Sequence, residues 1–590
     1  MYTLGINAAF HDSSACLVRD GRVVAAAEEE RFTRIKHAKR PVPFSAYELP
    51  YHAIDYCLAQ AGIGIDDVDH VAYAFDPHQL LRGRRDPAIA LPLEPSADPP
   101  PGWESPWEPL FVSYVLNAPR HLRDGAPHHL QTRLRQAKPA RMRWHFVDHH
   151  LAHEASAFLP SPFLEAAVMT LDGRGEIATT SYAIGRGNRL QRIGQVDYPH
   201  SLGLLYERIT EHLGFLHASD EYKVMALASY GEPRYLAAAR ELVTLDGDGG
   251  YRIAPLRLAE RFGPPRRRGE PLVQRHFDVA CSVQRLLEET VLALADWLHR
   301  RTGLRNLCLA GGVALNCVMN GRLLREGPFE QVWVQPAAGD AGTALGAALW
   351  VDARERRDPA RHYVMEHAYL GPSYTAEEIE SLLAGARLGY RRLRSFEPVA
   401  ELLAQDRIVG WFQGRMEFGP RALGARSILA SPLTRDMQGR LNELKDREDF
   451  RPVAPVVLEE EAGEWFVGCR SSPFMLFTFS VAPERRACIP SAVHVDGSAR
   501  VQTVNRRQHP EYYELIRAFR ARTGVPVLIN TSFNTRGEPI VCTPREALQC
   551  FAASPLDALV LGPFLLEKRK VFHERARIGG NSHVQAPALA

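Results

Sequence analysis

Two stretches of the chain share one layout, in which an apolar strand ends in a polar turn and two shorter strands follow. In TLGINAAFHDSSACLVRDGRVVAAAEEERF (3–32), SACLVR and RVVAAAE form the arms of a hairpin around Asp20-Gly21. In AVMTLDGRGEIATTSYAIGRGNRLQRIG (167–194), a strand ends in an Asp-Gly turn and two short strands come next. Identity between the stretches is slight, so the repeat is one of pattern.

A strand with a polar tip, followed by a hairpin and repeated once, is typical of the duplicated actin-like (ribonuclease-H-type, ASKHA) fold, whose halves enclose a nucleotide cleft. Two unrelated α/β domains would show a similar pattern, and that alternative stays open here. A chain of 590 residues exceeds one hydrophobic core. Because regularity lapses around 355–372, we expect an N-terminal domain at 1–367 and a second α/β domain at 368–590. The second domain should contain short strands at IVGWF, FMLFTFSV and VPVLINTSFN.

Charge argues against a nucleic-acid partner. The 71 basic and 69 acidic side chains leave a formal net charge of +2, without the basic excess that such binders usually carry. Seven of the basic residues are lysines and 64 are arginines, so a lysine is more informative than an arginine. Lys36, Lys223 and Lys445 each lie inside a motif, where a compact ammonium charge fits the position.

The expected location is the cytoplasm. The chain shows neither a signal-peptide pattern nor an apolar run of about 18 residues, so no membrane partner is expected. Its nine cysteines are scattered without a CxxC pair, which argues against a disulfide framework and against a thiolate zinc site. The oligomeric state is not readable from these features.

Residues 78–140 form a Pro- and Arg-rich insertion that breaks any structural period, with one helix expected near 108–122. It reads equally as a surface excursion or as a lid over an acceptor pocket. Its aromatic side chains could line such a pocket. These are Trp103, Trp107, Phe111 and Tyr114.

VDHHLAHEASAF (147–158) is the sharpest local motif. On a helix, His149 and His153 share one face, and histidines at this spacing can ligate one metal ion. An isolated HxxxH is usually incidental, but Asp172 and Asp340 each stand at a strand-end turn. Alone, each is a common turn-capping aspartate. Together, two imidazoles and two carboxylates suit Fe(II), Mn(II) or Zn(II).

The C-terminal region carries a basic cluster around glycines and small polar residues. Arg415, Arg421 and Arg426 lie in GRMEFGPRALGARSIL, and LKDREDFRPVAP supplies Lys445, Arg447 and Arg451. Arg500 follows, and LINTSFNTRGEPIV contributes Asn530, Ser532 and Asn534. Arginine forks beside Asn and Ser donors suit phosphate or carboxylate recognition, although a single arginine is more often a solvated surface group.

Eleven ordered blocks give the chain a specific resemblance. They are HDSSA, EEERFTRIKH, HHLAHEASAF, TLDGRGE, DEYKVMALASYG, AGGVALN, GDAGTALGAA, MEFGPRALGARSIL, FRPVAP, ARVQTV and NTSFNTRGEPIV. Together they resemble the NodU/CmcH/TobZ-type O-carbamoyltransferases over nearly the whole chain, apart from 78–140 and the tail past about residue 575.

The resemblance implies two active sites. The N-terminal part is similar to the actin-like (TsaD/Kae-type) proteins that install threonylcarbamoyl on tRNA, and the C-terminal part to their adenylate-forming partner YrdC. The YrdC-like domain would make carbamoyladenylate from ATP and carbamoyl phosphate, releasing pyrophosphate. In the N-terminal domain an acceptor hydroxyl would then attack the carbonyl, and AMP would leave.

Site residues follow from matching positions. The resemblance implies a divalent metal, Fe(II) before Mn, Zn or Mg, on the four residues that the spacing also suggests: His149, His153, Asp172 and Asp340. It places the adenylate against Gly311, Gly312 and Asn316, with Lys36 near its carbamoyl or phosphate end. It assigns carbamoyl phosphate and the ATP phosphates to Arg421, Lys445, Arg451, Arg500, Asn530 and Ser532.

The transfer step also needs a base for the acceptor hydroxyl, and His11, Asp12 and His37 near the N-terminal turn are unranked candidates. Asp446 departs from the expected pattern beside Lys445, where it either weakens phosphate affinity or points to solvent.

Three rival functions differ in what they need. A tRNA-modifying enzyme would call for a basic surface, a small-molecule kinase would not need HxxxH or the arginine cluster, and a non-catalytic sensor would form no product. The acceptor is expected to be a small natural product with a hydroxyl group, its identity unread, because kinship of fold does not select a substrate.

Overall fold

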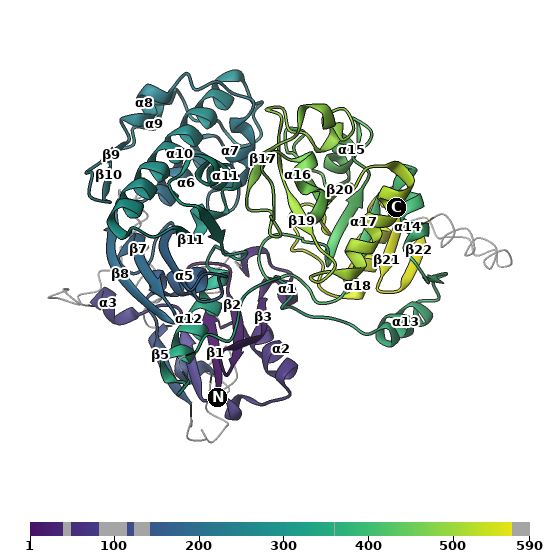
Figure 1. Cartoon of the computed structure of the whole chain (residues 1–590), viewed down its shortest axis with the longest axis horizontal. Helices are drawn as coiled ribbons and strands as arrows, with labels where there is room; N and C mark the ends of the chain where they lie inside the picture. Colours follow the sequence, from purple (N-terminus) through teal and green to yellow (C-terminus); the bar gives the residue numbers. More distant parts are fainter. Residues whose placement is uncertain (39–48, 82–114, 123–141, 359, 569–590) are drawn as a thin grey trace, which may run out of the picture.

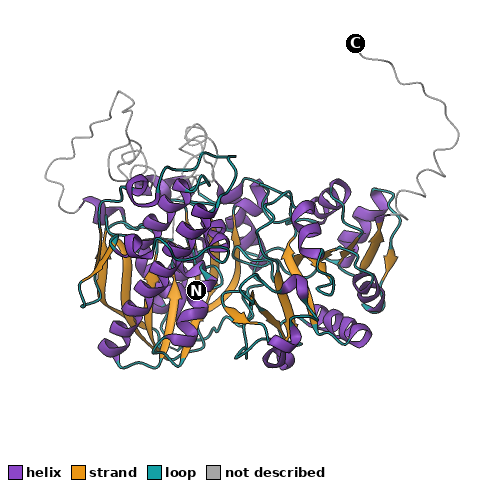
Figure 2. Ribbon diagram, turned by 90° about the horizontal axis from the view of Figure 1, so that it is seen from above, coloured by secondary structure: helices purple, strands orange, loops and turns teal. Residues whose placement is uncertain are grey.

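The computed structural model describes residues 1–38, 49–81, 115–122, 142–358 and 360–568. These residues form an α/β fold in which helices cover mixed β-sheets. The strands of the large sheets follow one another along the longest axis of the molecule (Figure 2). Most of the insertion at 78–140, including its four aromatic residues, lies outside the described residues. Within it, residues 115–122 are helical. No described helix combines the length and apolarity needed to cross a membrane.

The first two sheets repeat one topology. The first has the order β3-β2-β1-β4-β5, with β1 antiparallel to β2 and parallel to β4. The second has the order β8-β7-β6-β11-β12, with β6 antiparallel to β7 and parallel to β11. The repeated sequence pattern therefore corresponds to a repeated order and direction of strands.

The strand bounds agree with the expected hairpins. The first sheet contains β1 Tyr2–Asn7, β2 Ser14–Arg19, β3 Arg22–Glu28, β4 His70–Tyr73 and β5 Arg143–Phe146. The second contains β6 Glu165–Leu171, β7 Ala178–Arg186, β8 Arg189–Asp197, β11 Asn306–Ala310 and β12 Gln331–Val334. Asp20 and Gly21 both have positive φ, as a tight two-residue hairpin turn requires.

Helix α12 (Ala341–Glu355) packs between the two sheets against β1 and against α5 (His149–Phe158). Its small side chains allow this approach. A Cβ on Gly5 of β1 would lie 1.9 Å from the carbonyl oxygen of Ala344, and one on Gly346 would lie 1.9 Å from that of Ala152. This close packing brings the start of α12 beside α5.

Helices cover the outer face of the second sheet, with the 29-residue α10 (Gln274–Thr302) the longest among them (Figure 1). Its neighbours are α6 Leu202–His212, α7 Glu221–Ala228, α8 Leu236–Arg240 and α11 Cys317–Glu326. Around the first sheet lie α1 Glu30–Thr33, α2 Tyr51–Ala61 and α3 Pro77–Leu81. Leu and Val side chains of β6, β11 and α10 form a common core.

The C-terminal sheet has eight described strands in the order β13-β22-β21-β14-β15-β20-β16-β19, mostly antiparallel. Its central members are β14 Val409–Phe412, β15 Arg426–Ala430, β20 Val527–Ser532 and β16 Ala454–Leu458. The outer ones are β13 Arg391–Arg392, β22 Phe564–Glu567, β21 Ala558–Leu561 and β19 Gln502–Val504. The expected strand in FMLFTFSV is shorter: Thr478–Ser480 forms β17, and Val481 makes an isolated bridge to Phe466.

Six described α-helices share the core of this sheet. They are α13 Ala376–Gly385, α14 Glu397–Ala404, α15 Met437–Leu444, α16 Ala462–Trp465, α17 Pro510–Thr523 and α18 Pro544–Ala553.

Residues 28–34, which include α1, join the N-terminal part of the chain to the C-terminal part. Arg31 donates to the carbonyl of Gly419 at 2.9 Å, and the N–H of Gly419 donates to Glu28 at 2.8 Å. Arg34 donates to the carbonyls of Pro539 and Ile540. The N- and C-terminal parts thus meet through buried hydrogen bonds. The boundary at 367/368 stays a prediction.

Candidate functional site

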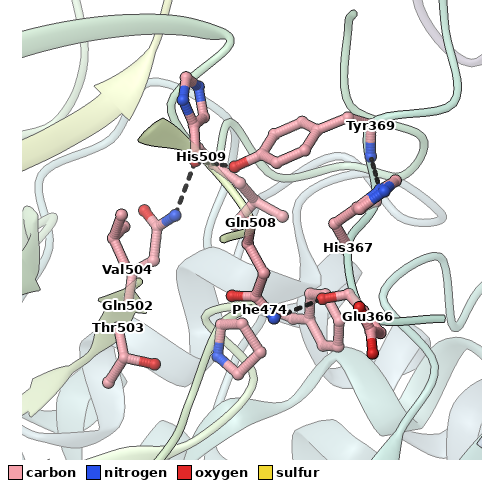
Figure 3. Close-up of a pocket in the computed structure, with 12 residues that line it drawn as sticks. Glu366, His367, Tyr369, Phe474, Gln502, Thr503, Val504, Gln508 and His509 are labelled. Atoms are coloured by element: carbon pink, nitrogen blue, oxygen red, sulfur yellow. Dashed lines mark hydrogen bonds between the residues drawn. The ribbon is translucent and has the colours of Figure 1, made fainter. Parts of the chain in front are cut away.

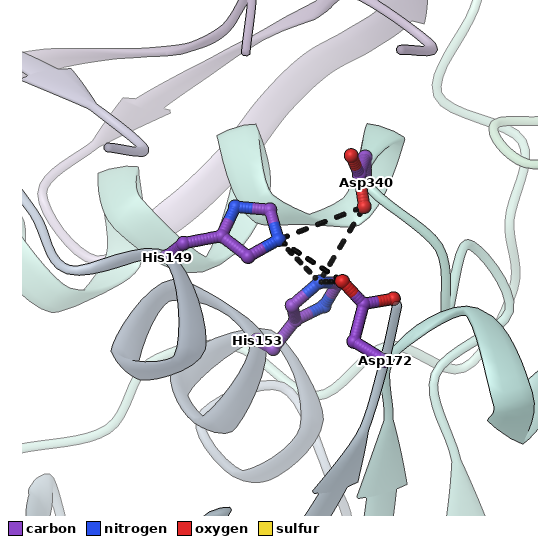
Figure 4. A group of neighbouring side chains, drawn as sticks. All are labelled: His149, His153, Asp172 and Asp340. Atoms are coloured by element: carbon purple, nitrogen blue, oxygen red, sulfur yellow. Dashed lines mark hydrogen bonds and ion pairs between the residues drawn. The ribbon is translucent and has the colours of Figure 1, made fainter. Parts of the chain in front are cut away.

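Four buried side chains from three separate elements converge at one point (Figure 4). His149 and His153 lie one turn apart on α5, Asp172 follows β6, and Asp340 precedes α12. The Nε2 atoms of the histidines are 3.2 Å apart. Asp172 Oδ2 lies 3.3 Å from His149 Nε2, and Asp340 Oδ1 lies 3.7 Å from both Nε2 atoms. Packing of α12 against α5 creates this group, called the quartet below.

The quartet fits a divalent cation. Asp340 Oδ1 is buried without a hydrogen-bond partner among the described residues, although it faces both imidazoles. His149 Nδ1 lies 3.4 Å from the carbonyl oxygen of Ala74, which favours a proton on Nδ1 and leaves the Nε2 lone pair facing the group. Burial lowers the pKa of His149, but Asp340 and Asp172 outweigh it and raise that pKa to about 10. A cation would take the place of that proton.

The N-terminal turn reaches the quartet through His11. Asp12 Oδ2 contacts His11 Nδ1 at 2.8 Å, and Asp12 Oδ1 contacts His37 Nδ1 at 2.8 Å. His11 Nε2 lies 3.8 Å from Asp340 Oδ2, whereas His37 Nε2 contacts Ser219 Oγ at 3.2 Å. The structure therefore brings all three base candidates together and turns His11 toward the quartet.

The loop predicted to bind the adenylate, which contains Gly311, Gly312 and Asn316, makes close contacts and hydrogen bonds with other parts of the protein. Gly311 has a φ of +92°, and a Cβ there would lie 2.2 Å from the Leu171 carbonyl oxygen. The N–H of Gly312 donates to Asp172 Oδ1 at 2.7 Å. Asn316 exchanges hydrogen bonds with Gln284 and caps α11. Gly312 thus orients a member of the quartet, and adenylate binding by this loop remains a prediction.

A second group consists of cations at the junction between the C-terminal sheet and the second sheet. This cation cluster contains Arg421, Lys445, Arg447, Arg451 and Arg500. Burial and the neighbouring positive charges lower the pKa values of Arg421 and Arg447 to about 9. Arg421 Nε and Arg447 Nη2 are buried without hydrogen-bond partners among the described residues. Like charges held this close favour a bound anion.

The cation cluster touches the loop that follows Gly312. Arg421 donates to the carbonyl of Leu315 at 3.3 Å, and Arg500 interacts with Cys317 at the start of α11. Lys36 also lies near enough to act on this cluster: burial is the main cause of the lowered pKa of Lys445, and Lys36 is among the charges that lower it further.

Three of the expected anion ligands already form hydrogen bonds with other groups of the protein. Lys445 Nζ contacts four oxygen atoms, two from Ser532 and two from Asn534, at 2.5 to 3.2 Å. Ser532 Oγ donates to Asn534 Oδ1 at 2.7 Å. Asn530 Nδ2 donates to Gln502 and to the Ala422 carbonyl, while its buried Oδ1 has no described partner. Direct ligation by Lys445 and Ser532 would require these contacts to open.

Other arginines of the basic motifs have structural contacts. Arg426 is fully buried, donates to the carbonyls of Gln413 and Pro372, and lies 3.6 Å above the ring of Phe412. Arg415 donates to the Leu370 carbonyl. Asp446 is exposed and lies 3.2 Å from Arg536, so it points away from the cation cluster.

Arg447 is not among the ligands that the family resemblance assigns, although its position in the motif between Lys445 and Arg451 signals it. Glu221 was also not singled out from the sequence as a buried polar residue. Glu221 lies at the start of α7, and its Oε1 atom is buried without a hydrogen-bond partner among the described residues. No local pattern distinguishes Glu221, because its surroundings come from distant segments.

A small recess lies between residues 366–369 and the C-terminal sheet (Figure 3). Its polar walls are already bonded: Gln508 donates to the carbonyl of Glu366 at 2.6 Å, and Gln502 donates to that of Leu423 at 2.7 Å. The ring of His509 packs edge-on against Tyr369. The recess is part of the contact between the two parts of the chain.

The fold and these two groups define a mixed α/β protein with a buried His/Asp centre and a separate cluster of buried cations. The carbamoyltransferase N-terminus family model matches residues 2–349, and the carbamoyltransferase C-terminus model matches residues 400–568. The chain belongs to the carbamoyltransferase family and is a carbamoyltransferase enzyme.

Relatives span most of the chain. Protein sll1178 of Synechocystis is 44% identical over 96% of this chain and 97% of its own length. Nodulation protein NolNO of Sinorhizobium fredii is 40% identical over 95% of this chain and 80% of its own length. Among solved structures, HypF of T. kodakarensis is 13% identical, with a TM-score of 0.32, over 61% of this chain and 49% of that one.

Proposed function

We propose that the chain is an ATP-dependent O-carbamoyltransferase that works in two steps. In the first, carbamoyl phosphate is hydrolysed at the cation cluster to carbamate and inorganic phosphate, and a carbamate oxygen then attacks the α-phosphorus of ATP, so that carbamoyladenylate forms and pyrophosphate leaves. In the second, the carbamoyl group passes to a hydroxyl of a small natural product at the quartet, and AMP leaves. We assign the N-terminal part to the actin-like fold and the C-terminal part to the YrdC-like fold.

The observation that carries this proposal is the separation of two chemically different groups joined by one loop. Arg421 of the cation cluster contacts the carbonyl of Leu315, and three residues earlier Gly312 contacts Asp172 of the quartet. Triphosphate chemistry needs preorganised cations, while transfer to a hydroxyl needs a polarised carbonyl and a base. The two groups supply these requirements separately.

In the first step, the guanidinium groups of Arg421, Arg447 and Arg500 hold the phosphate charges. Their lowered pKa values reflect burial and repulsion, both of which a bound anion offsets. Lys445 fixes Ser532 and Asn534 at the end of β20, so the strand edge beside the arginines keeps one shape.

In the second step, His11 is the base. Asp12 Oδ2 accepts a hydrogen bond from the Nδ1–H of His11, and in this tautomer Nε2 can receive a proton from the acceptor hydroxyl. His149, His153, Asp172 and Asp340 would hold a divalent metal, which we propose to be Fe(II). When bound, such an ion supplies Lewis-acid polarisation of an oxygen. Asp340 belongs to the quartet and its Oδ2 lies 3.8 Å from His11 Nε2, so His11 is placed beside that centre.

The test measures both steps on the purified chain. Pyrophosphate release should require ATP and carbamoyl phosphate together, and a panel of hydroxyl acceptors should include one that gains the mass of a carbamoyl group. Release of ADP with a phosphorylated acceptor would instead identify a kinase.

A further inference from the structure

The motif DEYKVMALASYG (220–231) has no role in the steps above, yet its Lys223 reaches across the chain. The Lys223 side chain, on α7, is only 12% exposed. Its Nζ lies 2.8 Å from Glu448 Oε1 and 3.1 Å from Asp220 Oδ2. Glu448 belongs to the loop 445–451 that carries three members of the cation cluster. Lys223, in the N-terminal part of the chain, therefore binds the loop of the cation cluster, which is called the activation site below because the first proposed step would take place there.

The same contacts also fix the position of Arg451. Glu448 Oε2 lies 3.7 Å from Arg451 Nη1, while the Arg451 guanidinium carbon lies 4.7 Å from the ring centroid of Tyr222. A cation over an aromatic face is attracted by its quadrupole. Arg451 thus lies between the carboxylate of Glu448 and the ring of Tyr222. Tyr222 is the neighbour of Lys223 in the chain, and Lys223 binds Glu448. Tyr230 of the same motif also donates to the carbonyl of Phe450 at 3.2 Å.

The charge arrangement gives Lys223 a specific task. Glu448 is a carboxylate beside a cluster of cations, and an unrestrained carboxylate there would compete with an anionic substrate for Arg451. Burial opposes the charge on Lys223, but Glu448 and Asp220 outweigh it and raise its pKa above the usual value. Lys223 stays charged and keeps one oxygen of Glu448 engaged.

We propose that Lys223 is a positioning residue of the activation site, which holds Glu448 so that Arg451 is placed to meet the phosphate of carbamoyl phosphate. This inference rests on the function proposed above. It means that the activation site takes part of its framework from α7, so the two parts of the chain build it jointly.

Lys223→Met tests the inference through carbamoyl-phosphate-dependent pyrophosphate release. We expect the KM for carbamoyl phosphate to rise about tenfold while kcat changes less than about threefold, because a misplaced cation weakens binding in ground and transition state alike. Lys223→Arg keeps a cation at this position and should recover most of the affinity. A role in stability alone would lower the melting temperature and leave the KM unchanged.

Two further variants sharpen the test. Glu448→Gln breaks the same contact from the other side, and the double variant with Lys223→Met should be no worse than either single one. Arg536→Met is the matched control, because it removes the exposed Asp446–Arg536 ion pair beside this loop and leaves the Lys223–Glu448 contact in place. Its KM should equal that of the wild type.

The outcomes separate the two proposals. If the wild-type chain releases no pyrophosphate with carbamoyl phosphate and ATP, the proposed function fails. If the wild type does so and folded Lys223→Met and Glu448→Gln keep its KM, or if their effects simply add, the positioning role is overturned.

Discussion

The Nε2 atoms of His149 and His153 lie 3.2 Å apart on successive turns of α5, and both face carboxylate oxygens of Asp172 and Asp340. Two buried imidazole nitrogens at that separation need a shared proton or a cation between them. The two carboxylates supply negative charge for either. The local sequence pattern and the tertiary packing thus agree on one centre.

Removing a quartet member should remove a bound metal. We expect purified protein loaded with Fe(II) to lose stoichiometric metal in His153→Ala, measured by atomic absorption. His150→Gln should keep it, because His150 is on the same helix but contacts Thr170 Oγ1 instead. Equal metal content in His153→Ala and wild type would contradict the assignment.

The quartet was predictable because each member carried a local signal. The i, i+4 spacing placed His149 and His153 on one helix face, and Asp172 and Asp340 both followed apolar strands. The use of Gly312 and Lys445 for internal hydrogen bonds was not predictable, since their partners lie 140 and 87 to 89 residues away in the chain. Family motifs mark such residues without saying whether they touch a substrate or another part of the protein.

The topology was also readable in part. The repeated hairpin predicted two similar halves, and both sheets have the same strand order. The apolar run of FMLFTFSV predicts a longer strand than the structure contains, because its side chains are buried by contacts from several segments rather than by a neighbouring strand alone.

The contact between β1 and α12 should tolerate no side chain at Gly5. A Cβ there would lie 1.9 Å from the backbone oxygen of Ala344, so Gly5→Ala must displace α12. We expect a loss of about 1–3 kcal/mol in the free energy of unfolding, measured by urea denaturation. Gly439→Ala is the control: it lies in α15 with open space around it, and Ala should be neutral or stabilising there.

His276 should make the protein sensitive to mild acid. Burial, with Arg275 and Arg266, lowers its pKa from 6.5 to about 4, while its Nδ1 accepts the N–H of Val273. Because the unfolded state binds the proton more readily, stability is complete above pH 6.5 and falls as the pH drops toward 4. His276→Gln should flatten melting temperature against pH in that window; an unchanged slope would exclude His276 as the cause.

Anions should stabilise the cation cluster. We expect inorganic pyrophosphate to raise the melting temperature of the wild type in a concentration-dependent way, because it binds the folded state and relieves repulsion among buried guanidinium groups. Arg447→Met removes one of those charges and should show a smaller rise. Arg536→Met, an exposed arginine nearby, should respond like the wild type. An equal response in all three would place anion binding elsewhere.

The two proposed steps should separate by mutation. Arg421→Ala removes a preorganised cation, and the loss of one such group typically costs on the order of 100- to 1,000-fold in rate. It should reduce pyrophosphate release and recover transfer when carbamoyladenylate is supplied. His149→Ala should keep pyrophosphate release and fail to carbamoylate the acceptor, with or without the supplied intermediate.

The most direct measurement is pyrophosphate release and acceptor carbamoylation on the same preparations of wild type, Arg421→Ala and His149→Ala. The two-site account predicts that Arg421→Ala loses the first activity and that His149→Ala loses only the second. If folded His149→Ala loses pyrophosphate release as well, the account is contradicted, and a single composite site must replace it.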